Sequence, residues 1–260
     1  MFKNSMFRMK NTVPVFENRK RRSTGTWPLV ILLCVACFVP FSLHASEYVY
    51  SFENTAGLRL QKVSAVTTSF KGNSALRVEL LPEVIKGKYG TDYIDRDTLV
   101  VIPGTEGFRN GIIDVDVIGQ LGPEAPPYAR AFLGIAFRVS ENLSGFEAMY
   151  IRPTNARADD QIRRNHTTQY FSFPDHPFSR LRKDEPERYE SYVDLDMNEW
   201  THMRIEVKDS TARLYINGAR QPALIVNDLK LGTSQSGSVG LWTEIGTVAY
   251  FSKLKVKYNK

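Results

Sequence analysis

The sequence predicts an all-β protein built as an antiparallel sandwich of two sheets. In residues 199–218, apolar and polar side chains alternate with the period of 2 that a strand buried on one face requires. Lys208-Asp209-Ser210 and Asn217-Gly218 supply the turn residues that delimit a hairpin there. A hairpin with one apolar face needs a second layer to cover it. Roughly twelve strand segments, with no helical pattern longer than a turn or two, extend this prediction to the whole domain.

Residues 1–45 have the organisation of a secretory signal peptide with a long basic start. Residues 19–22 are all basic, an apolar run extends over 29–43, and Ala45 stands at the expected cleavage position. A retained membrane anchor is the alternative, although the run is short for a bilayer and Pro40 interrupts it. We therefore expect a secreted protein, extracellular or periplasmic, with no membrane contact after cleavage and a single domain over residues 46–260.

Removal of this leader leaves a neutral chain without cysteine. Seven of the 34 basic and one of the 28 acidic residues lie in 1–45, so 27 of each sign remain. The sequence pI near 9.2 is thus a property of the leader, and nothing indicates a nucleic-acid partner. Cys34 and Cys37 also lie in the leader. The mature domain must therefore be held together by core burial, without disulfides or thiolate metal sites.

The predicted strands follow one another along the domain, bounded by turn residues. Leu76, Val78 and Leu80 face inward in one of them, and Ile113, Val115 and Val117 do so in another. The segments are 48–52, 58–62, 74–80, 98–102, 111–117, 131–139, 145–153, 189–195, 201–207, 212–216, 223–226, 239–243 and 248–256.

Two segments depart from simple alternation. In 131–139 one face carries Phe132, Gly134, Ala136 and Arg138, and its small residues predict open space above the sheet, the floor of a groove. Residues 155–187 are charged and aromatic without a sustained period of 2, which predicts a long loop. Its aromatic content argues against disorder and favours a functional loop.

The order of these segments resembles the concanavalin A-like lectin/glucanase superfamily, in its laminin-G-like branch. The resemblance lies in Trp200, 214–218 (Leu-Tyr-Ile-Asn-Gly), 240–242 (Gly-Leu-Trp) and 249–254 (Ala-Tyr-Phe-Ser-Lys-Leu). The closing residues, together with 134–138, are also similar to secreted 3-keto-disaccharide hydrolase domains. The resemblance implies a two-sheet jelly roll, a fold that serves lectins, glycosidases and adhesion modules alike.

Three carboxylates are the candidates for catalysis: Glu147, Asp114 and Asp116. The two aspartates share one strand face, a spacing that could serve a glycosidase pair. Family 16 glucanases carry a Glu-x-Asp-x-Glu or Glu-x-Asp-x-x-Glu strand motif, which this chain lacks. Solvated strand carboxylates are therefore the preferred interpretation of Asp114 and Asp116.

A second group of residues suits the binding of a sugar. Planar polar side chains hydrogen-bond sugar hydroxyls, and aromatic rings lie under the apolar sugar face. We expect Arg138, Tyr150 and Arg152 to point towards one groove that the 155–187 loop completes. The alternative is a loop tied down by Arg–Asp pairs, with its aromatic residues capping the sandwich edge. The full set of candidates is Arg138, Tyr150, Arg152, Asn155, Arg163, His166 and Tyr170.

No cofactor is expected, apart from calcium as a weaker alternative at Asp159 and Asp160. The leading hypothesis is a secreted carbohydrate-binding module that contacts sugar hydroxyls, or a uronate or sulfate group, with an oligo- or polysaccharide as partner. A glycoside hydrolase of the 3-keto-disaccharide type and a laminin-G-like protein-interaction module are the two alternatives. The sequence specifies neither the glycan nor the oligomeric state.

Overall fold

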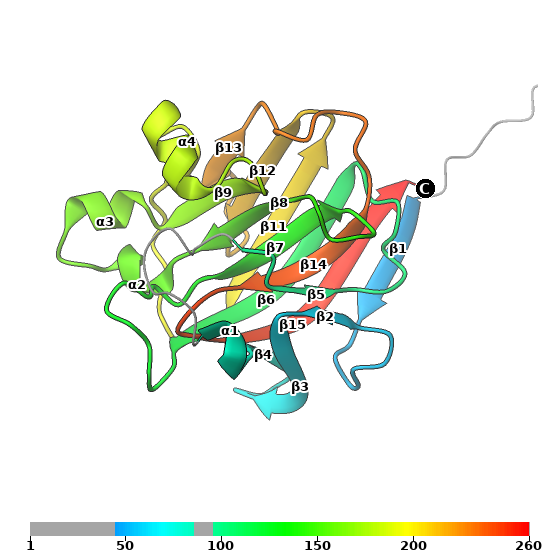
Figure 1. Cartoon of the computed structure of the whole chain (residues 1–260), viewed down its shortest axis with the longest axis horizontal. Helices are drawn as coiled ribbons and strands as arrows, with labels where there is room; N and C mark the ends of the chain where they lie inside the picture. Colours follow the sequence, from blue (N-terminus) through cyan, green and yellow to red (C-terminus); the bar gives the residue numbers. More distant parts are fainter. Residues whose placement is uncertain (1–44, 86–95, 260) are drawn as a thin grey trace, which may run out of the picture. The chain divides into compact units, whose positions relative to one another are not determined.

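The structure, a computed structural model, describes residues 45–85 and 96–259. Both cysteines, the basic run and the apolar run of the predicted leader lie outside these residues. Within these residues, fifteen strands form two antiparallel sheets that pack face to face, and this confirms the predicted sandwich (Figure 1). In the described part of the chain, no helix has the length and apolar character needed to cross a membrane.

The larger sheet has the strand order β13-β12-β11-β6-β15-β4-β3, with β1 paired to β15. Its strands are β1 (Ala45–Tyr50), β3 (Val63–Phe70), β4 (Asn73–Leu80), β6 (Gly111–Leu121), β11 (Thr201–Lys208), β12 (Thr211–Ile216), β13 (Leu224–Val226) and β15 (Thr247–Asn259). The smaller sheet has the order β10-β9-β8-β7-β14-β5-β2. Its strands are β2 (Arg59–Gln61), β5 (Leu99–Val101), β7 (Leu133–Val139), β8 (Phe146–Ile151), β9 (Thr168–Phe173), β10 (Glu190–Ser191) and β14 (Ser238–Thr243).

Four short helices complete the described chain. They are α1 (Pro82–Ile85), α2 (Pro153–Ala156), α3 (Gln161–Asn165) and α4 (Phe178–Asp184). The last three gather on one side of the molecule, at the left in Figure 1, beside strands β8 and β9.

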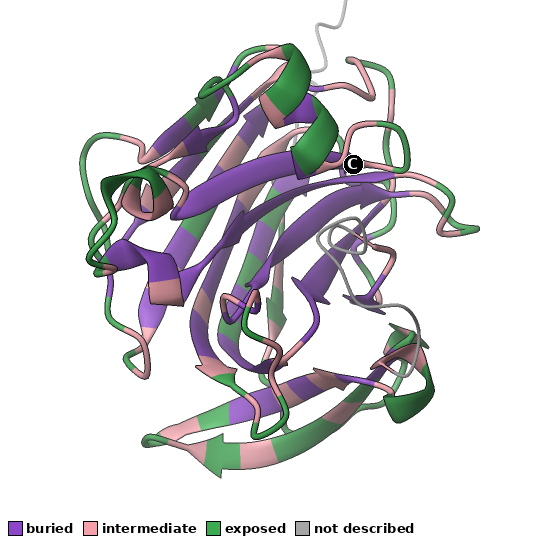
Figure 2. Cartoon of the chain, turned by 60° about the vertical axis from the view of Figure 1, so that its left-hand side comes forward, coloured by how far each residue is buried: buried purple, intermediate pink, exposed green. Residues whose placement is uncertain are grey.

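Alternation predicts the larger sheet well, because its inner face is buried, whereas its outer face is buried only in places, such as around Ile118, Val248 and Tyr250. Ile113, Val115 and Val117 of β6 have no exposed surface, and Met203 and Ile205 of β11 lie beside them in the same inward layer. The predicted hairpin of residues 199–218 is confirmed as β11 and β12. The hairpin of β3 and β4 projects beyond the other strands, and β3 is largely exposed (Figure 2).

The smaller sheet hides its pattern because β7 and β8 are buried on both faces. The prediction of a long loop over 155–187 is wrong there: the segment contains β9 between helices α3 and α4. Thr168 and Gln169 of β9 are polar yet buried, and their side chains hydrogen-bond backbone carbonyls of 189–191. A buried polar residue that has its hydrogen bonds is stable inside a sheet, and it removes the alternation by which a strand is recognised.

The predicted groove floor on 131–139 is also wrong. Ala136 has no exposed surface, and an added Cβ on Gly134 would lie 2.3 Å from the carbonyl oxygen of Met149 on β8. Gly134 therefore permits the close approach of the neighbouring strand and leaves no open space above the sheet.

Candidate functional site

A pocket of about 180 Å³ lies at the end of the smaller sheet where β7 begins and β8 ends. Arg152 follows β8 directly, and Pro153 then starts α2. Asp160 caps α3 by accepting a hydrogen bond from the backbone N–H of Arg163, and Arg163 and the C-cap residue His166 of this helix line the pocket. We call this the basic pocket; its lining residues are Tyr128, Arg130, Phe132, Arg152, Asn155, Arg163, His166, Phe178 and Arg182.

Arg152 is the most firmly held member of the basic pocket. One of its nitrogens donates to the hydroxyl of Tyr150 at 2.7 Å and to Oε1 of Gln169 at 3.2 Å, and another donates to the carbonyl of His166 at 3.0 Å. Its guanidinium carbon lies 4.9 Å from the ring centre of Tyr150 and 5.3 Å from that of Phe178. Hydrogen bonds and ring contacts thus fix the orientation of this cation before any ligand is present.

The basic pocket has an excess of positive charge. Glu190 pairs with Arg182 at 2.5 Å and with His166 at 3.1 Å. Among the described carboxylates, none lies within ion-pair distance of Arg130, Arg152 or Arg163. Four arginines and one glutamate therefore give the basic pocket a net positive charge, which favours an anionic ligand.

This charge also shifts the pKa values of two lining residues. Burial lowers the pKa of Arg130, and the neighbouring Arg163 and Arg152 lower it further. Burial likewise lowers the pKa of His166; Glu190 opposes the shift, and Arg182 and Arg152 add to it. His166 is therefore neutral at neutral pH and gains a proton when the solution becomes acidic.

The predicted binding residues divide into two groups. Arg152, Asn155, Arg163 and His166 line the basic pocket, and Tyr150 supports it through Arg152. Arg130 and Arg182 also line it and were missed by the sequence analysis. Arg182 lies in the charged segment 155–187, whereas Arg130 carries no sequence signal beyond standing in front of a buried strand.

The expectation that Arg138 shares a groove with Tyr150 and Arg152 is wrong. A β-bulge at this point of β7 gives Arg138 a φ of +54° and ends the simple alternation. Its side chain is fully buried and donates to the backbone carbonyls of Arg109 at 3.0 Å, Gly232 at 2.8 Å and Asp209 at 2.6 Å. Arg138 therefore binds three chain segments together inside the domain.

Tyr170 and Glu147 belong to the same interior. The Glu147 side chain has no exposed surface, and its Oε1 accepts from the backbone N–H of Leu231 at 2.7 Å and from the Tyr170 hydroxyl at 3.4 Å. Its Oε2 has no hydrogen-bond donor among the described residues and lies 3.8 Å from Nη1 of Arg138. Burial raises the pKa of Glu147 to about 7, although the Leu231 N–H and Arg138 oppose this shift.

Asp114 and Asp116 lie on the outer face of the larger sheet, away from the basic pocket. Both bind His202, Asp116 through Nδ1 at 2.8 Å and Asp114 through Nε2 at 3.2 Å. Burial favours the protonated form of Asp114, but hydrogen bonds from His202 and Arg204 outweigh it and lower its pKa to about 2. The same two aspartates raise the pKa of His202 to about 9. Two ionised carboxylates cannot supply the general acid that glycoside hydrolysis requires.

The calcium candidates Asp159 and Asp160 immediately precede α3. Asp160 serves as the cap of α3, as described above, and no group of three His, Cys, Asp or Glu residues within 45–85 and 96–259 is arranged to hold a metal ion.

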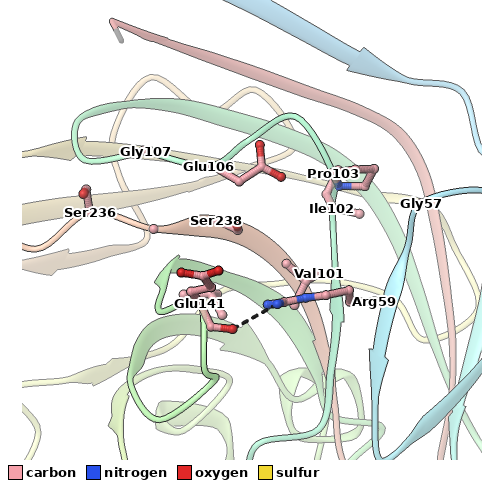
Figure 3. Close-up of a pocket in the computed structure, with 12 residues that line it drawn as sticks. Gly57, Arg59, Val101, Ile102, Pro103, Glu106, Gly107, Glu141, Ser236 and Ser238 are labelled. Carbon is pink, nitrogen blue, oxygen red and sulfur yellow. Dashed lines mark hydrogen bonds between the residues drawn. The ribbon is translucent and has the colours of Figure 1, made fainter.

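A larger pocket, of about 560 Å³, lies at the opposite end of the smaller sheet, where β7 ends and β14 begins (Figure 3). Arg59 of β2 and Glu141 of the β7–β8 turn both line this pocket, and Arg59 donates a hydrogen bond to the backbone carbonyl of Glu141 at 2.9 Å. We call this the glutamate pocket. Its lining residues are Gly57, Arg59, Val101, Ile102, Pro103, Glu106, Gly107, Val139, Glu141, Ser236, Gly237 and Ser238.

No family model and no curated protein matches the sequence. Among solved structures, the chain is similar to a carbohydrate-binding module, CBM66, from Bacillus subtilis, with 9% identity and a TM-score of 0.45 over 75% of this chain and 96% of that one. It is also similar to a Bacillus subtilis protein of unknown function with a galectin-like fold, with 12% identity and a TM-score of 0.48 over 84% and 100% of the two chains.

A third similar structure is domain 4 of AbnA, an extracellular GH43 arabinanase from Geobacillus stearothermophilus, in complex with arabinotriose. Its identity is 13% and its TM-score 0.40, over 83% of this chain and 82% of that one. Because every TM-score lies below 0.5, the likeness carries no argument about function.

Proposed function

We propose that the protein is a secreted carbohydrate-binding domain whose basic pocket binds the acidic group of a glycan, a uronate carboxylate or a sulfate ester. The observation that carries the proposal is the convergence of Arg130, Arg152 and Arg163 on one pocket, with no described carboxylate within ion-pair distance of any of them. Guanidinium groups match carboxylate and sulfate oxygens with paired N–H donors, and such charge-assisted hydrogen bonds are the strong ones.

The aromatic residues of the basic pocket support a sugar as the carrier of that acidic group. The half-buried Tyr128 lines the pocket beside the arginines, and the buried Phe132 and Phe178 lie behind it in the same lining. Apolar ring faces next to planar hydrogen-bonding groups suit a pyranose, which has an apolar face and a polar rim.

Binding is favoured over hydrolysis because the described carboxyls with a raised pKa are enclosed. These are Glu147 and Glu244, both without exposed surface; Glu147 lies near Arg138, and Glu244 pairs with Arg96. Neither of them lines the basic pocket or the glutamate pocket. A hydrolase needs a protonated acid that touches the scissile bond.

The test is calorimetric titration of the purified protein with trigalacturonate, its fully methyl-esterified form and a sulfated glycosaminoglycan oligosaccharide. We expect an acidic ligand to bind and the methyl ester to bind weakly or not at all. Arg163→Ala should weaken acidic binding about tenfold, because one charge-assisted hydrogen bond contributes about 1.5 kcal/mol or more.

Arg180→Ala is the matched control, since Arg180 lies on α4 near the basic pocket but is exposed and pairs with Asp184. It should leave the affinity unchanged. The proposal is refuted if no acidic glycan binds, or if Arg163→Ala and Arg180→Ala bind acidic glycans equally well.

A further inference from the structure

The glutamate pocket has the size and composition of a binding site but a charge opposite to that of the basic pocket. Its volume of about 560 Å³ falls within the range of roughly 300–1,000 Å³ that is usual for small-ligand sites. Glu106 and Glu141 contribute two carboxylates against the single cation of Arg59. A site with this balance disfavours a uronate or a sulfate.

The polar groups of the glutamate pocket retain hydrogen-bonding capacity for a ligand. Among the described residues, neither Glu106 nor Glu141 forms an ion pair, and Glu106 accepts only the nearby N–H of Gly104 at 3.0 Å. Arg59 uses one terminal nitrogen for the Glu141 carbonyl, which leaves its other terminal nitrogen as a donor. Ser236 and Ser238 add two hydroxyls to the same rim.

This mixture of acceptors and donors suits a neutral diol. A sugar hydroxyl donates one hydrogen bond and accepts others, so adjacent hydroxyls are best satisfied by a carboxylate next to a guanidinium or hydroxyl. Of the apolar lining residues, Val101, Ile102 and Val139 are buried, and the half-buried Pro103 can lie against one face of a pyranose ring. We propose that the glutamate pocket is a second binding site, specific for a neutral pyranose unit.

The two pockets lie at opposite ends of β7, whose seven residues at about 3.3 Å each separate them by about 23 Å. That the ligand of the glutamate pocket is a sugar rests partly on the function proposed above, whereas its discrimination against an acidic unit follows from the charge of the pocket alone. The two sites should therefore select different units of a glycan, an acidic one and a neutral one.

Saturation-transfer NMR on the full chain tests this proposal with methyl β-glucopyranoside, methyl β-galactopyranoside and methyl α-mannopyranoside at millimolar concentration, the range in which single sugars bind. Methyl glucuronide and glucosamine serve as the anionic and cationic probes. We expect transfer to at least one neutral glycoside, and little transfer to methyl glucuronide in Arg163→Ala, where the basic pocket is impaired.

Glu141→Gln should weaken binding of the neutral glycoside about tenfold, because it removes a charged acceptor and keeps the backbone carbonyl that holds Arg59. Glu124→Gln, which alters another exposed glutamate on a turn, should leave saturation transfer to the neutral glycoside unchanged, and so should Arg163→Ala. If this transfer is lost in Glu141→Gln but kept in Arg163→Ala, the neutral glycoside binds in the glutamate pocket and not in the basic pocket.

Three results would overturn the proposal. The first is the absence of saturation transfer to all three neutral glycosides, and the second is equal binding of the neutral glycoside by Glu141→Gln and Glu124→Gln. The third is stronger binding of glucosamine than of every neutral glycoside, which would make the glutamate pocket a cation site. None of them affects the acidic-glycan titration, so the two proposals can fail independently.

Discussion

Replacement of Glu147 by glutamine should change the pH dependence of stability in a calculable way. The side chain has no exposed surface, and burial raises its pKa from 4.5 to about 7. Between these two values the unfolded chain has released this proton while the folded chain still holds it. The free energy of unfolding therefore falls as the pH rises from 4.5 to 7.

The size of the effect follows from the shift of the pKa. At about 1.4 kcal/mol per pH unit, the raised pKa corresponds to a loss of about 3 kcal/mol, complete once the pH exceeds the folded pKa. Glutamine does not titrate and keeps an oxygen to accept the Leu231 N–H. The difference in unfolding free energy between Glu147→Gln and the unaltered protein should thus move by about 3 kcal/mol in favour of the variant across this window.

Urea denaturation followed by tryptophan fluorescence at a series of pH values measures this difference, because all other titrating groups cancel in the subtraction. Glu199→Gln, which alters an exposed glutamate paired with Lys71, is the control for the loss of a surface carboxylate. A flat profile for Glu147→Gln, or one that rises in the opposite direction, would refute the inference that burial dominates at this carboxyl.

Three other outcomes are expected. Arg138→Met should destabilise the fold by about 3 kcal/mol or more in urea denaturation, because three backbone carbonyls lose the donor that joins them; an effect below about 1 kcal/mol would contradict the inference that Arg138 binds these segments together. Acidification from neutral pH should strengthen binding of a sulfated oligosaccharide in calorimetry, since His166, whose pKa is lowered by burial, gains a positive charge in the basic pocket as it becomes protonated, and His166→Gln should abolish this pH dependence. Gly134→Ala should lower stability by about 1–3 kcal/mol because its Cβ would meet the Met149 carbonyl. Gly145→Ala is the matched control, since the nearest atom there is 3.8 Å away, and equal stability of the two variants would contradict the steric argument.

The predicted part of the candidate site came from local sequence alone. Arg152, Asn155, Arg163 and His166 lie within fifteen consecutive residues, and short helices bring them to one pocket. Arg130 joins them from a different part of the chain, and Arg182 enters through α4. No local pattern predicts that these segments meet.

The glutamate pocket could not be predicted for a related reason. Its lining comes from β2, β5, β7, β14 and the turns next to them, and each of these segments has the sequence of an ordinary strand or turn. Which turns lie at the same end of a sheet depends on the strand order, and strand order is a property of the whole chain.

The sequence by itself determined the β-sandwich and the larger sheet, because the inward-facing apolar residues of its strands, such as Ile113, Val115 and Val117, recur at every second position. Tertiary structure alone decided the smaller sheet and the direction of its polar side chains. Burial on both faces erases alternation, so Arg138 and Glu147 look like surface residues in the sequence although both lie in the interior. A charged residue is stable there only if hydrogen-bond partners distant in sequence, such as Asp209, Leu231 and Gly232, are brought to it by the fold.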